Sequence, residues 1–365
     1  MAGSPRVVVC LSGGVDSAVA GHLLKEQGYD VAAITFWLWS FAGAPDYAGA
    51  TKCCSLDTAA LAARELGVPH EEIDASDAFQ KHVLEDFVAR YRRGETPNPC
   101  GRCNRNLRFG QALRYAEEHG FDYVATGHHV RLSQEPDGSL SLHRGSDPNK
   151  DQTYFLYGLQ QPDLARLLFP VGNLTKDEVF AIARESGLSA AELPESQDLC
   201  FAVEGETSFL FEEIDFRPGP ILDADGRELG KHRGLPHYTI GQRRGLGITS
   251  DRPMFVIDVD AKRNALIVGH DEDLMANGLV TGDASFVTID PPEDGARVEA
   301  KIRYRSNAKP AIFHQLPGER FALCFDEPQR AITPGQLAVL YEGDRLLGGG
   351  TIVARDACRD RSPSV

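Results

Sequence analysis

The chain has 365 residues, of which 42% are hydrophobic and 25% are charged, and its formal net charge is −15. This length is more than one hydrophobic core usually organises, so two or three domains are expected, and the composition excludes a wholly disordered chain. No apolar run approaches the roughly 20 residues that span a bilayer, and we predict a cytoplasmic protein without membrane contact. The negative charge alone argues against nucleic-acid binding, although a local basic face can coexist with it.

Strand-like and helix-like patterns alternate over the first 130 residues. Runs of β-branched and apolar residues predict strands, and apolar periodicity with cap and stop signals predicts helices. Such alternation is typical of a parallel sheet with helices on both faces and a ligand site at the carboxyl ends of its strands. We therefore expect an α/β domain over residues 1–206. Its predicted strands are 6–11, 30–36, 70–73 and 122–126, and its predicted helices are 16–27, 55–66 and 77–92.

The pattern changes at about residue 215, where turn signals such as R-P-G-P, D-A-D-G and R-G-L-P separate short β-like runs. No helix-like segment lies between these runs, which favours a small β domain followed by a β-barrel. We expect a small central β-rich domain over 207–275, a C-terminal β-barrel over 276–356 and a loose tail over 357–365. The predicted strands are 254–258, 265–269, 297–304, 311–315, 320–325 and 337–341.

The segment Ser12-Gly13-Gly14-Val15-Asp16-Ser17 follows the first predicted strand and opens the first predicted helix. Glycines allow a tight bend that exposes backbone N–H groups, a helix N-terminus adds partial positive charge, and serines add hydroxyl donors. The segment therefore predicts a cradle for a pyrophosphate-like anion. It differs from the G-x-x-x-x-G-K-S/T phosphate loop, which carries a lysine for the terminal phosphates.

The eight cysteines fall into different sequence environments. Cys10 and Cys324 lie in apolar strand-like runs and are expected to be core residues. Cys100 and Cys103 lie in the polar stretch N-P-C-G-R-C-N, which we interpret as a turn. A reducing compartment makes catalysis or metal binding the expected role of such thiols. Cys53-Cys54 is expected in a loop after the second strand, where incidental thiols are favoured over a relay or ligand role.

The string S-G-G-V-D-S is similar to the signature of the PP-loop ATP pyrophosphatases, which implies that ATP adenylates a substrate oxygen and that pyrophosphate is released. Further segments follow in order, and from about residue 5 to 355 the chain resembles the bacterial tRNA-specific 2-thiouridylase family. These segments are T-P-N-P at 96–99, A-T-G-H-H at 125–129, N-K-D-Q-T-Y-F-L at 149–156, S-Q-D-L-C-F at 196–201, T-I-G-Q-R-R-G-L-G at 239–247, R-Y-R at 303–305 and T-P-G-Q at 333–336.

The resemblance implies an adenine nucleotide hydrolase-like domain and a tRNA-uridine 2-sulfurtransferase activity. ATP with Mg²⁺ would adenylate oxygen 2 of the wobble uridine, at position 34, and sulfur would then displace AMP. The residues implied to hold ATP are Cys10, Leu11, Ser12, Gly13, Gly14, Val15, Asp16, Ser17, Phe36 and Gly127. Those implied to touch the tRNA anticodon stem-loop are His128, Lys150, Asp151, Gln152, Arg303, Tyr304 and Gln336. The implied catalytic set is Cys103 as nucleophile, Cys200 as persulfide carrier, Cys100 and Asp16.

Sulfur delivery is left open, because Cys100 stands where the family commonly has Asp. One hypothesis is a persulfide relay from Cys200 to Cys103, which ends in a disulfide and is supplied by a cysteine desulfurase or a sulfur carrier. The additional thiol favours the other, a four-iron four-sulfur cluster held by Cys100, Cys103 and Cys200. Structural zinc is least favoured, since it takes four ligands and only three are evident unless His128 or His129 joins them.

Two other classes of function share part of this pattern. A PP-loop ligase or amidotransferase acting on a small molecule would carry S-G-G-V-D-S but would not use the three cysteines or the barrel. A non-catalytic RNA-binding protein would not need an intact Asp16 and Ser17. Any RNA function requires basic residues to converge on one face despite the net negative charge. Those residues are concentrated at 92–93, 102–108, 243–244 and 301–309.

Overall fold

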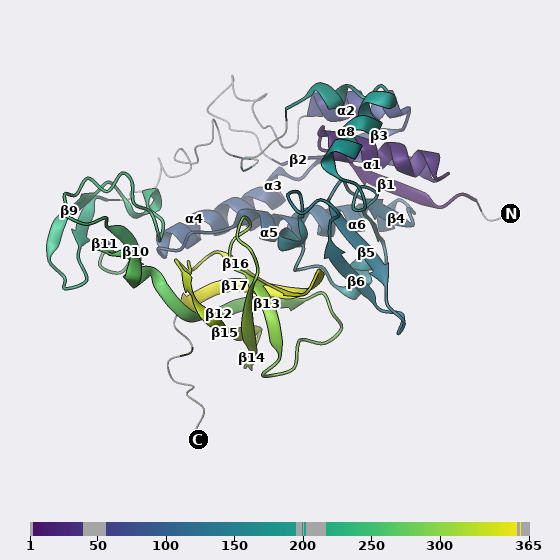
Figure 1. Cartoon of the computed structure of the whole chain (residues 1–365). Coiled ribbons are helices and arrows are strands. Elements are labelled where there is room, and N and C mark those ends of the chain that lie inside the picture. The colour runs from purple at the N-terminus through teal and green to yellow at the C-terminus, as the bar shows by residue number, and fades with distance from the viewer. Residues whose placement is uncertain are drawn as a thin grey trace.

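The computed structural model describes residues 3–38, 56–194, 199, 201, 217–355 and 358. The chain forms an N-terminal α/β part, a central β-sheet and a C-terminal β-barrel, as the sequence predicted (Figure 1). The barrel lies against helices α4 (Glu85–Arg92) and α5 (Pro99–Cys103) of the N-terminal part, and the central sheet lies beyond the end of α4 (Figure 1). Within these described ranges, no helix has the length and apolar character needed to cross a membrane.

The N-terminal sheet is parallel, with the strand order β3-β2-β1-β4-β7. Successive side chains of a strand point to opposite faces, so Val7 and Val9 enter one core cluster and Val8 enters the other. Helices α1, α2 and α8 supply the first cluster and helices α3 to α6 supply the second, which confirms the predicted layers. The elements are β1 (Arg6–Cys10), α1 (Val15–Glu26), β2 (Asp30–Trp37), α2 (Leu56–Leu66), β3 (His70–Asp74), β4 (Tyr123–Ala125), β7 (Leu167–Leu168) and α8 (Lys176–Glu185).

The strand order reverses between β1 and β4. The chain leaves β1 toward β2 on one side, while β4 pairs with β1 on the other side. Such a reversal opens a crevice at the carboxyl ends of the two strands, where ligands of open α/β sheets bind. The segments that follow β1 and β4 contain the S-G-G-V-D-S string and Gly127, so the fold brings these two predicted positions together.

Two helical segments, each with a π-helical turn, cover the second face of the sheet. The first comprises α3 (Ser76–Phe79), η1 (Gln80–Leu84) and α4, and the sequence predicted it as one helix. The second comprises α5, η2 (Asn104–Arg108) and α6 (Phe109–Glu118). The prediction of a turn around Cys100 and Cys103 was wrong, because Pro99 occupies the first helical turn after an extended Asn98 and so starts a helix.

The β-rich half contains an open sheet and a closed barrel. The central sheet has the order β10-β11-β8-β9, and the barrel order β12-β15-β14-β13-β16-β17 is closed by a β12–β17 pairing. A hairpin from the N-terminal part, β5–β6, extends the barrel sheet through the His143–Arg345 pair. The strands are β5 (Val130–Gln134), β6 (Leu140–Arg144), β8 (Gly219–Leu222), β9 (Glu228–His232), β10 (Phe255–Asp260), β11 (Ala265–Gly269), β12 (Met275–Phe286), β13 (Arg297–Lys301), β14 (Lys309–Leu316), β15 (Arg320–Arg330), β16 (Leu337–Glu342) and β17 (Arg345–Arg355).

Short helical turns complete the connections. They are η3 (Thr153–Phe155), α7 (Gln161–Leu164), η4 (Ser189–Glu192), η6 (Leu235–His237) and η7 (Asp271–Leu274). The core cluster on the second face of the N-terminal sheet continues into the barrel, since it contains both Cys103 and the barrel residues Leu337 and Tyr341. The two parts are therefore joined by a shared hydrophobic core.

Cys324 was expected to be a core residue, but it is only half-buried and is disulfide-bonded. Cys324 is half-buried on β15 and forms a disulfide with Cys358, 34 residues further along the chain and inside the predicted loose tail. Gly278 of β12 lies opposite Cys324, and a Cβ atom at Gly278 would collide with the Cys358 sulfur. The missing side chain of Gly278 therefore leaves the space that the Cys358 side chain occupies.

Candidate active site

The loop between β1 and α1, called the PP-loop here (residues 11–17), is held closed by its own serines. The Ser17 hydroxyl donates to the Gly14 carbonyl oxygen over 2.9 Å and accepts from the Ser12 backbone N–H over 3.2 Å. Gly13 has a φ of +83°, which glycine adopts without strain. Gly14 caps α1 and has no side chain that could accept a hydrogen bond from the first N–H groups of the helix. This geometry suits an anion such as pyrophosphate.

Gly127 follows β4 and supports the PP-loop from across the crevice. A Cβ atom at Gly127 would lie 2.5 Å from the Asp16 carbonyl carbon and 2.5 Å from the Ser17 amide nitrogen, far inside an ordinary contact. Only glycine lets the two backbones approach this closely. This close backbone contact therefore fixes the position of the start of α1.

Asp16, in the first turn of α1, lies between two buried basic side chains. Its Oδ1 accepts hydrogen bonds from Lys176 Nζ over 2.6 Å and from His129 Nε2 over 3.1 Å. Burial by itself raises the pKa of the Asp16 carboxyl, but the hydrogen bond from His129 and the charge of Lys176 outweigh it and lower that pKa. Asp16 is therefore ionised near neutral pH, and His129 donates from Nε2 because a carboxylate only accepts.

Lys176 and His129 were not among the site residues predicted from the sequence. Lys176 is the first residue of α8, directly after the Thr175 cap and its capping box with Glu178. A cation at a helix N-terminus is unfavourable, because it repels the positive end of the helix dipole. A lysine directly after a helix cap was therefore the sequence signal that could have marked Lys176 as a functional residue. His129 is 2% exposed, and its backbone N–H donates to Gln152 Oε1 over 2.9 Å. Gln152 is therefore connected to Asp16 through His129.

Several of the residues predicted to hold ATP have side chains that are not free to meet a ligand, and Phe36 and Cys10 are two examples. Phe36 is 6% exposed and packs in the core, which leaves its backbone for a nucleotide. Burial raises the pKa of the Cys10 thiol to about 12, although the charge of Arg108 opposes this. Cys10 is therefore protonated near neutral pH and unsuited to act as a nucleophile. The adjacent Trp37 ends β2 at the same sheet edge and is 42% exposed.

Cys100 and Cys103 lie one helical turn apart on α5, so their side chains project from the same side of that helix. Cys103 is 6% exposed and packs in the core cluster, whereas Cys100 is half-buried. Burial, the charge of Asp151 and the thiol of Cys100 raise the pKa of Tyr304. Cys100 therefore lies close enough to the barrel residue Tyr304 to act on its charge.

Cys200, Cys53 and Cys54 lie outside the described residues. The two residues that flank Cys200 are described, and both belong to the region around Cys103. Phe201 is 1% exposed and makes edge-to-face contacts with Phe79 and Phe87, at ring-centroid distances of 6.0 and 5.2 Å. Leu199 packs against the core cluster that contains Cys103.

The segment Lys150–Gln152 is predicted to touch tRNA, and the side chains of Asp151 and Gln152 make contacts within the protein. Asp151 is 6% exposed, and its Oδ1 accepts from the Thr153 backbone N–H over 3.1 Å and from the Thr153 hydroxyl over 2.7 Å. The Asp151 side chain thus closes a local turn onto the first residue of η3. Gln152 accepts from His129, as described above. RNA contact by these residues stays a prediction, and Lys150 is the cationic member of the segment.

The other predicted tRNA contacts lie at the junction with the barrel or beside the PP-loop. Tyr304 packs on Phe155, with ring centroids 4.6 Å apart, and Gln336 Nε2 donates to the Thr96 carbonyl oxygen over 2.9 Å. Arg303 is exposed. His128 lies between Phe109 and Phe169, and burial together with the charge of Arg108 lowers its pKa to about 3. A neutral His128 can hydrogen-bond or stack on a base but cannot pair with phosphate by charge.

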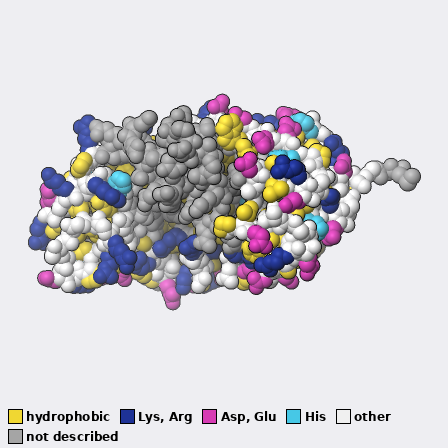
Figure 2. Space-filling view, turned by 90° about the horizontal axis from the view of Figure 1, so that it is seen from above, with side chains coloured by type: hydrophobic (Ala, Val, Ile, Leu, Met, Phe, Trp, Pro, Cys, Tyr) yellow, Lys and Arg dark blue, Asp and Glu magenta, His cyan; other side chains and the backbone are white. Residues whose placement is uncertain are grey.

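The surface charge is unevenly distributed. Figure 2 shows Lys and Arg side chains gathered toward the central-sheet end of the molecule, whereas Asp and Glu are more frequent over the N-terminal part. The exposed basic residues of the central part include Lys231, Arg233, Arg243 and Arg244. This separation of charge lets a basic surface coexist with a net charge of −15.

Three family models match consecutive parts of the chain. They are described as the tRNA methyl transferase HUP domain, over residues 5–204, the tRNA methyl transferase PRC-barrel domain, over 207–270, and the aminomethyltransferase beta-barrel domain, over 276–352. The first of these matches more than half of the chain.

Curated relatives match almost the whole chain. A tRNA-specific 2-thiouridylase of Moorella thermoacetica is 48% identical, covering 94% of this chain and 98% of the relative. Proteins of the same name from Gloeothece citriformis and Geobacter metallireducens are 46% and 44% identical. They cover 95% and 96% of this chain, and 99% and 97% of the respective relatives.

Proposed function

The chain belongs to the tRNA-specific 2-thiouridylase family, and we propose that it catalyses ATP-dependent 2-thiolation of the wobble uridine, position 34, of tRNA. One observation supports this proposal above the others. The helix that carries Cys100 and Cys103 continues through η2 to Arg108, whose charge acts on both Cys10 of β1 and His128 after β4. A thiol-bearing helix thus adjoins a pyrophosphate-type anion cradle.

Adenylation is the first chemical step of the proposal. Oxygen 2 of the uracil attacks the α-phosphorus of ATP, the bond to the β-phosphate oxygen breaks, and pyrophosphate leaves. The N-terminal N–H groups of α1 and the buried cation Lys176 would stabilise the charge that develops on the phosphates. Asp16 is ionised and its side chain is 31% exposed, so its carboxylate could hold a Mg²⁺ ion, which would supply positive charge near the phosphates.

Sulfur transfer is the second step, and it uses Cys103 and Cys200. In a persulfide relay, the terminal sulfur of a Cys200 persulfide attacks carbon 2 and AMP leaves. The Cys103 thiolate then attacks the Cys200 sulfur, the bond between Cys200 and the transferred sulfur breaks, and 2-thiouridine leaves with that sulfur on carbon 2. A thiol reductant reduces the resulting Cys103–Cys200 disulfide and restores both thiols. The sulfur would come from a cysteine desulfurase or a sulfur carrier. The burial of Leu199 and Phe201 in the region of Cys103 supports a meeting of the two thiols.

The alternative route is a four-iron four-sulfur cluster held by Cys100, Cys103 and Cys200. Cys100 and Cys103 project from one side of α5, and Cys200 would supply the third ligand. A bound cluster would hold incoming sulfide at an open iron. The chain's own contribution would then be to keep water away from the site, since Cys103 is 6% exposed. The cluster requires Cys100 as a ligand, whereas the persulfide relay uses only Cys103 and Cys200.

The tRNA would dock across the N-terminal part and the barrel. The wobble base must leave its stack to reach the crevice, as bases do in other base-modifying enzymes. Lys150 and Arg303 supply cations for phosphates, and Tyr304 and His128 supply rings for stacking. All four lie on the N-terminal part or on the barrel beside it.

The proposal is tested by release of pyrophosphate from ATP and by mass-spectrometric detection of 2-thiouridine. We expect pyrophosphate release that requires tRNA and is lost in Asp16→Ala. We expect Cys103→Ser and Cys200→Ser to abolish thiolation while binding tRNA within about threefold of the native protein. A small-molecule ligase would release pyrophosphate without tRNA, and a non-catalytic RNA-binding protein would release none.

A parallel test separates the two sulfur routes. Iron and acid-labile sulfide are measured after anaerobic purification, and Cys100→Asp is assayed for thiolation. Stoichiometric iron and an inactive Cys100→Asp variant support the cluster. An active, iron-free Cys100→Asp variant with a trappable persulfide on Cys200 supports the relay.

A further inference from the structure

The segment that leads into the cysteine helix α5 is paired with the barrel. The Thr96 backbone N–H donates to the Pro334 carbonyl oxygen over 2.9 Å, and the Asn98 N–H donates to the Gly335 carbonyl oxygen over 3.2 Å. The side chain of Gln336 donates to the Thr96 carbonyl oxygen from the same barrel loop. Three hydrogen bonds therefore hold the start of α5 to the loop before β16.

This pairing depends on Gly335. Its φ is +93°, and a Cβ atom there would lie 2.8 Å from the Thr96 backbone. The two backbones are thus in direct contact, with no room for a side chain. One turn further, Gly101 of α5 meets the barrel in the same way, since its Cβ would lie 2.7 Å from Leu337 Cδ1. Both Leu337 and Cys103 belong to one buried cluster.

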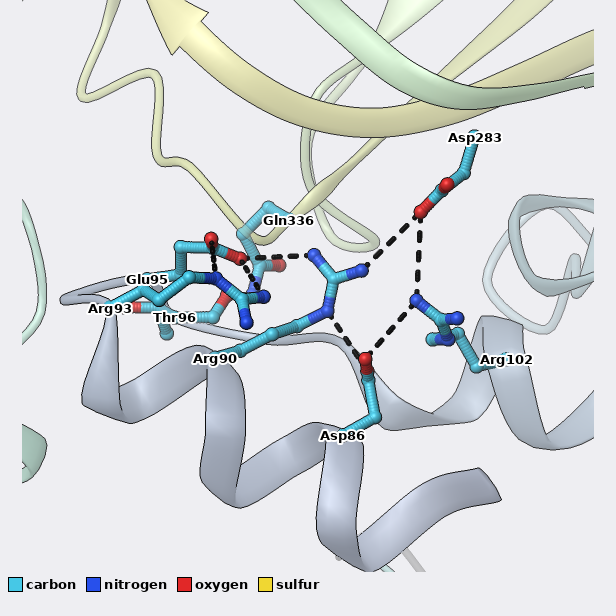
Figure 3. Close-up of polar contacts among 8 residues, drawn as sticks. All are labelled: Asp86, Arg90, Arg93, Glu95, Thr96, Arg102, Asp283 and Gln336. Atoms are coloured by element: carbon cyan, nitrogen blue, oxygen red, sulfur yellow. Dashed lines mark hydrogen bonds and ion pairs between the residues drawn. The ribbon is translucent and has the colours of Figure 1, made fainter. Parts of the chain in front are cut away.

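A charged network fastens α5 to the barrel on another side (Figure 3). The Arg90 guanidinium, with 8% of its side chain exposed, lies 2.9 Å from Asp86, 3.0 Å from Glu95 and 3.4 Å from Asp283. Arg102, between the two cysteines of α5, lies 3.3 Å from Asp86 and 3.6 Å from Asp283. Asp283 belongs to the barrel strand β12, so it connects the barrel to α5 through Arg102.

Asp283 reaches these arginines because β12 is irregular there. The pairing of β12 with β17 shifts register between Gly282 and Ser285, and Asp283 has a φ of +52°. Bulges of this kind redirect a side chain out of the normal alternation of a strand. Figure 3 shows the redirected carboxylate pointing from the barrel toward Arg90 and Arg102.

We propose that the C-terminal barrel positions the cysteine helix. In this proposal Gly335 and Asp283 are positioning residues that set the orientation of α5, and hence of the Cys103 thiol, relative to the PP-loop. The importance of that thiol for thiolation rests on the proposed function, but the orientation of α5 does not. The barrel would therefore be required for sulfur transfer even when tRNA is bound and adenylated.

The test compares Gly335→Ala with Gly343→Ala. Both glycines lie in barrel turns with positive φ, at +93° and +61°, so both variants carry backbone strain. A Cβ atom at Gly343 meets nothing within 4 Å, whereas one at Gly335 collides with Thr96. Only Gly335→Ala should therefore displace the start of α5.

Three quantities are measured for each variant. The first is the rate at which iodoacetamide alkylates Cys103, read by peptide mass spectrometry. The other two are tRNA-dependent pyrophosphate release and single-turnover thiolation. In Gly335→Ala we expect Cys103 alkylation to change by about tenfold, thiolation to fall by about tenfold and pyrophosphate release to stay within about twofold. Gly343→Ala should match the native protein in all three. Native alkylation and thiolation rates in Gly335→Ala would overturn the proposal.

A second pair of variants serves if Gly335→Ala does not fold. Asp283→Asn removes the charge that faces Arg102, and Asp326→Asn removes a barrel carboxylate whose partner, Arg297, is an exposed residue of the barrel itself. We expect Asp283→Asn alone to change Cys103 alkylation and slow thiolation, and Asp283→Glu to restore both in part. Equal behaviour of Asp283→Asn and Asp326→Asn would refute the positioning role. If Cys103→Ser thiolates tRNA normally, the proposed role of Cys103 in thiolation fails. The alkylation rates of Cys103 in the barrel variants would still show whether the barrel sets the orientation of α5.

Discussion

Gly127→Ala is the perturbation that tests most directly how the PP-loop is held. The new Cβ would lie 2.5 Å from two backbone atoms of Asp16 and Ser17, and ordinary contact begins near 3.4 Å, so about 0.9 Å of movement is needed. β4 is hydrogen-bonded to β1 and β7 and cannot retreat freely. We therefore expect the start of α1 to move.

The size of the effect follows from that displacement. A misplacement of about 1 Å at a reacting centre costs on the order of 100-fold in rate, so adenylation should fall by about that factor. Overpacking at a backbone contact should also cost about 1–3 kcal/mol of stability. The loss of rate should exceed what partial unfolding explains, because most of the chain remains folded.

The assay is tRNA-dependent pyrophosphate release, together with the rise in unfolding temperature that saturating ATP produces. Gly110→Ala is the matched control, since its Cβ would meet only the Arg105 carbonyl oxygen at 3.9 Å and it lies in helix α6. That variant should be as active as the native protein. Native pyrophosphate release and an unchanged ATP shift in Gly127→Ala would refute the reasoning.

Two further predictions concern stability. Cys358→Ser should lower the stability of the barrel by about 3–4 kcal/mol, because the disulfide to Cys324 closes a loop of 34 residues. Dithiothreitol should lower the unfolding temperature of the native protein and leave Cys358→Ser unchanged, and an equal response of both would contradict the prediction. For His128, the pKa is about 3 in the folded chain against 6.5 as the ordinary value, so the unfolded chain binds the additional proton between these pH values. Stability should therefore be complete above pH 6.5 and fall by about 1.4 kcal/mol per pH unit below it, which urea unfolding at pH 7, 6 and 5 measures. His128→Asn should remove this contribution, and an unchanged acid slope in that variant would show that other groups cause it.

Local sequence was sufficient for the elements whose signals lie in a few neighbouring residues. The β-branched run after Arg6 and the glycines before Asp16 predict a strand, a tight turn and a helix, and β1, the PP-loop and α1 follow that order. Hydrophobic burial and backbone geometry act over this short range, so the pattern alone carries the information. The same reasoning predicted the three-part organisation from the loss of helix-like segments after residue 215.

Local signals were weak where the chain gains stability from distant partners. β17 contains the run Gly348-Gly349-Gly350, which disfavours a strand in isolation, yet it pairs with both β12 and β16 and closes the barrel. Cys324 looked like a core residue because nothing near it in sequence shows that Cys358 returns to it. The start of the helix after Asn98 was missed because the polar residues around Cys100, together with Pro99 and Gly101, are typical of a turn.

The sequence by itself determined which residues can do chemistry: the anion cradle, the ionisable Asp16 and the thiols of Cys100 and Cys103. Tertiary structure alone decided what surrounds them. Lys176 reaches Asp16 from 160 residues away, and Asp283 reaches Arg102 through a bulge in the barrel. Charges and close backbone contacts act through space, at a few ångströms, and chain distance does not reveal them. For that reason the sequence motifs predicted only part of the site, whereas Lys176 and His129 beside Asp16, and the contacts between the cysteine helix and the barrel, became visible only in the fold.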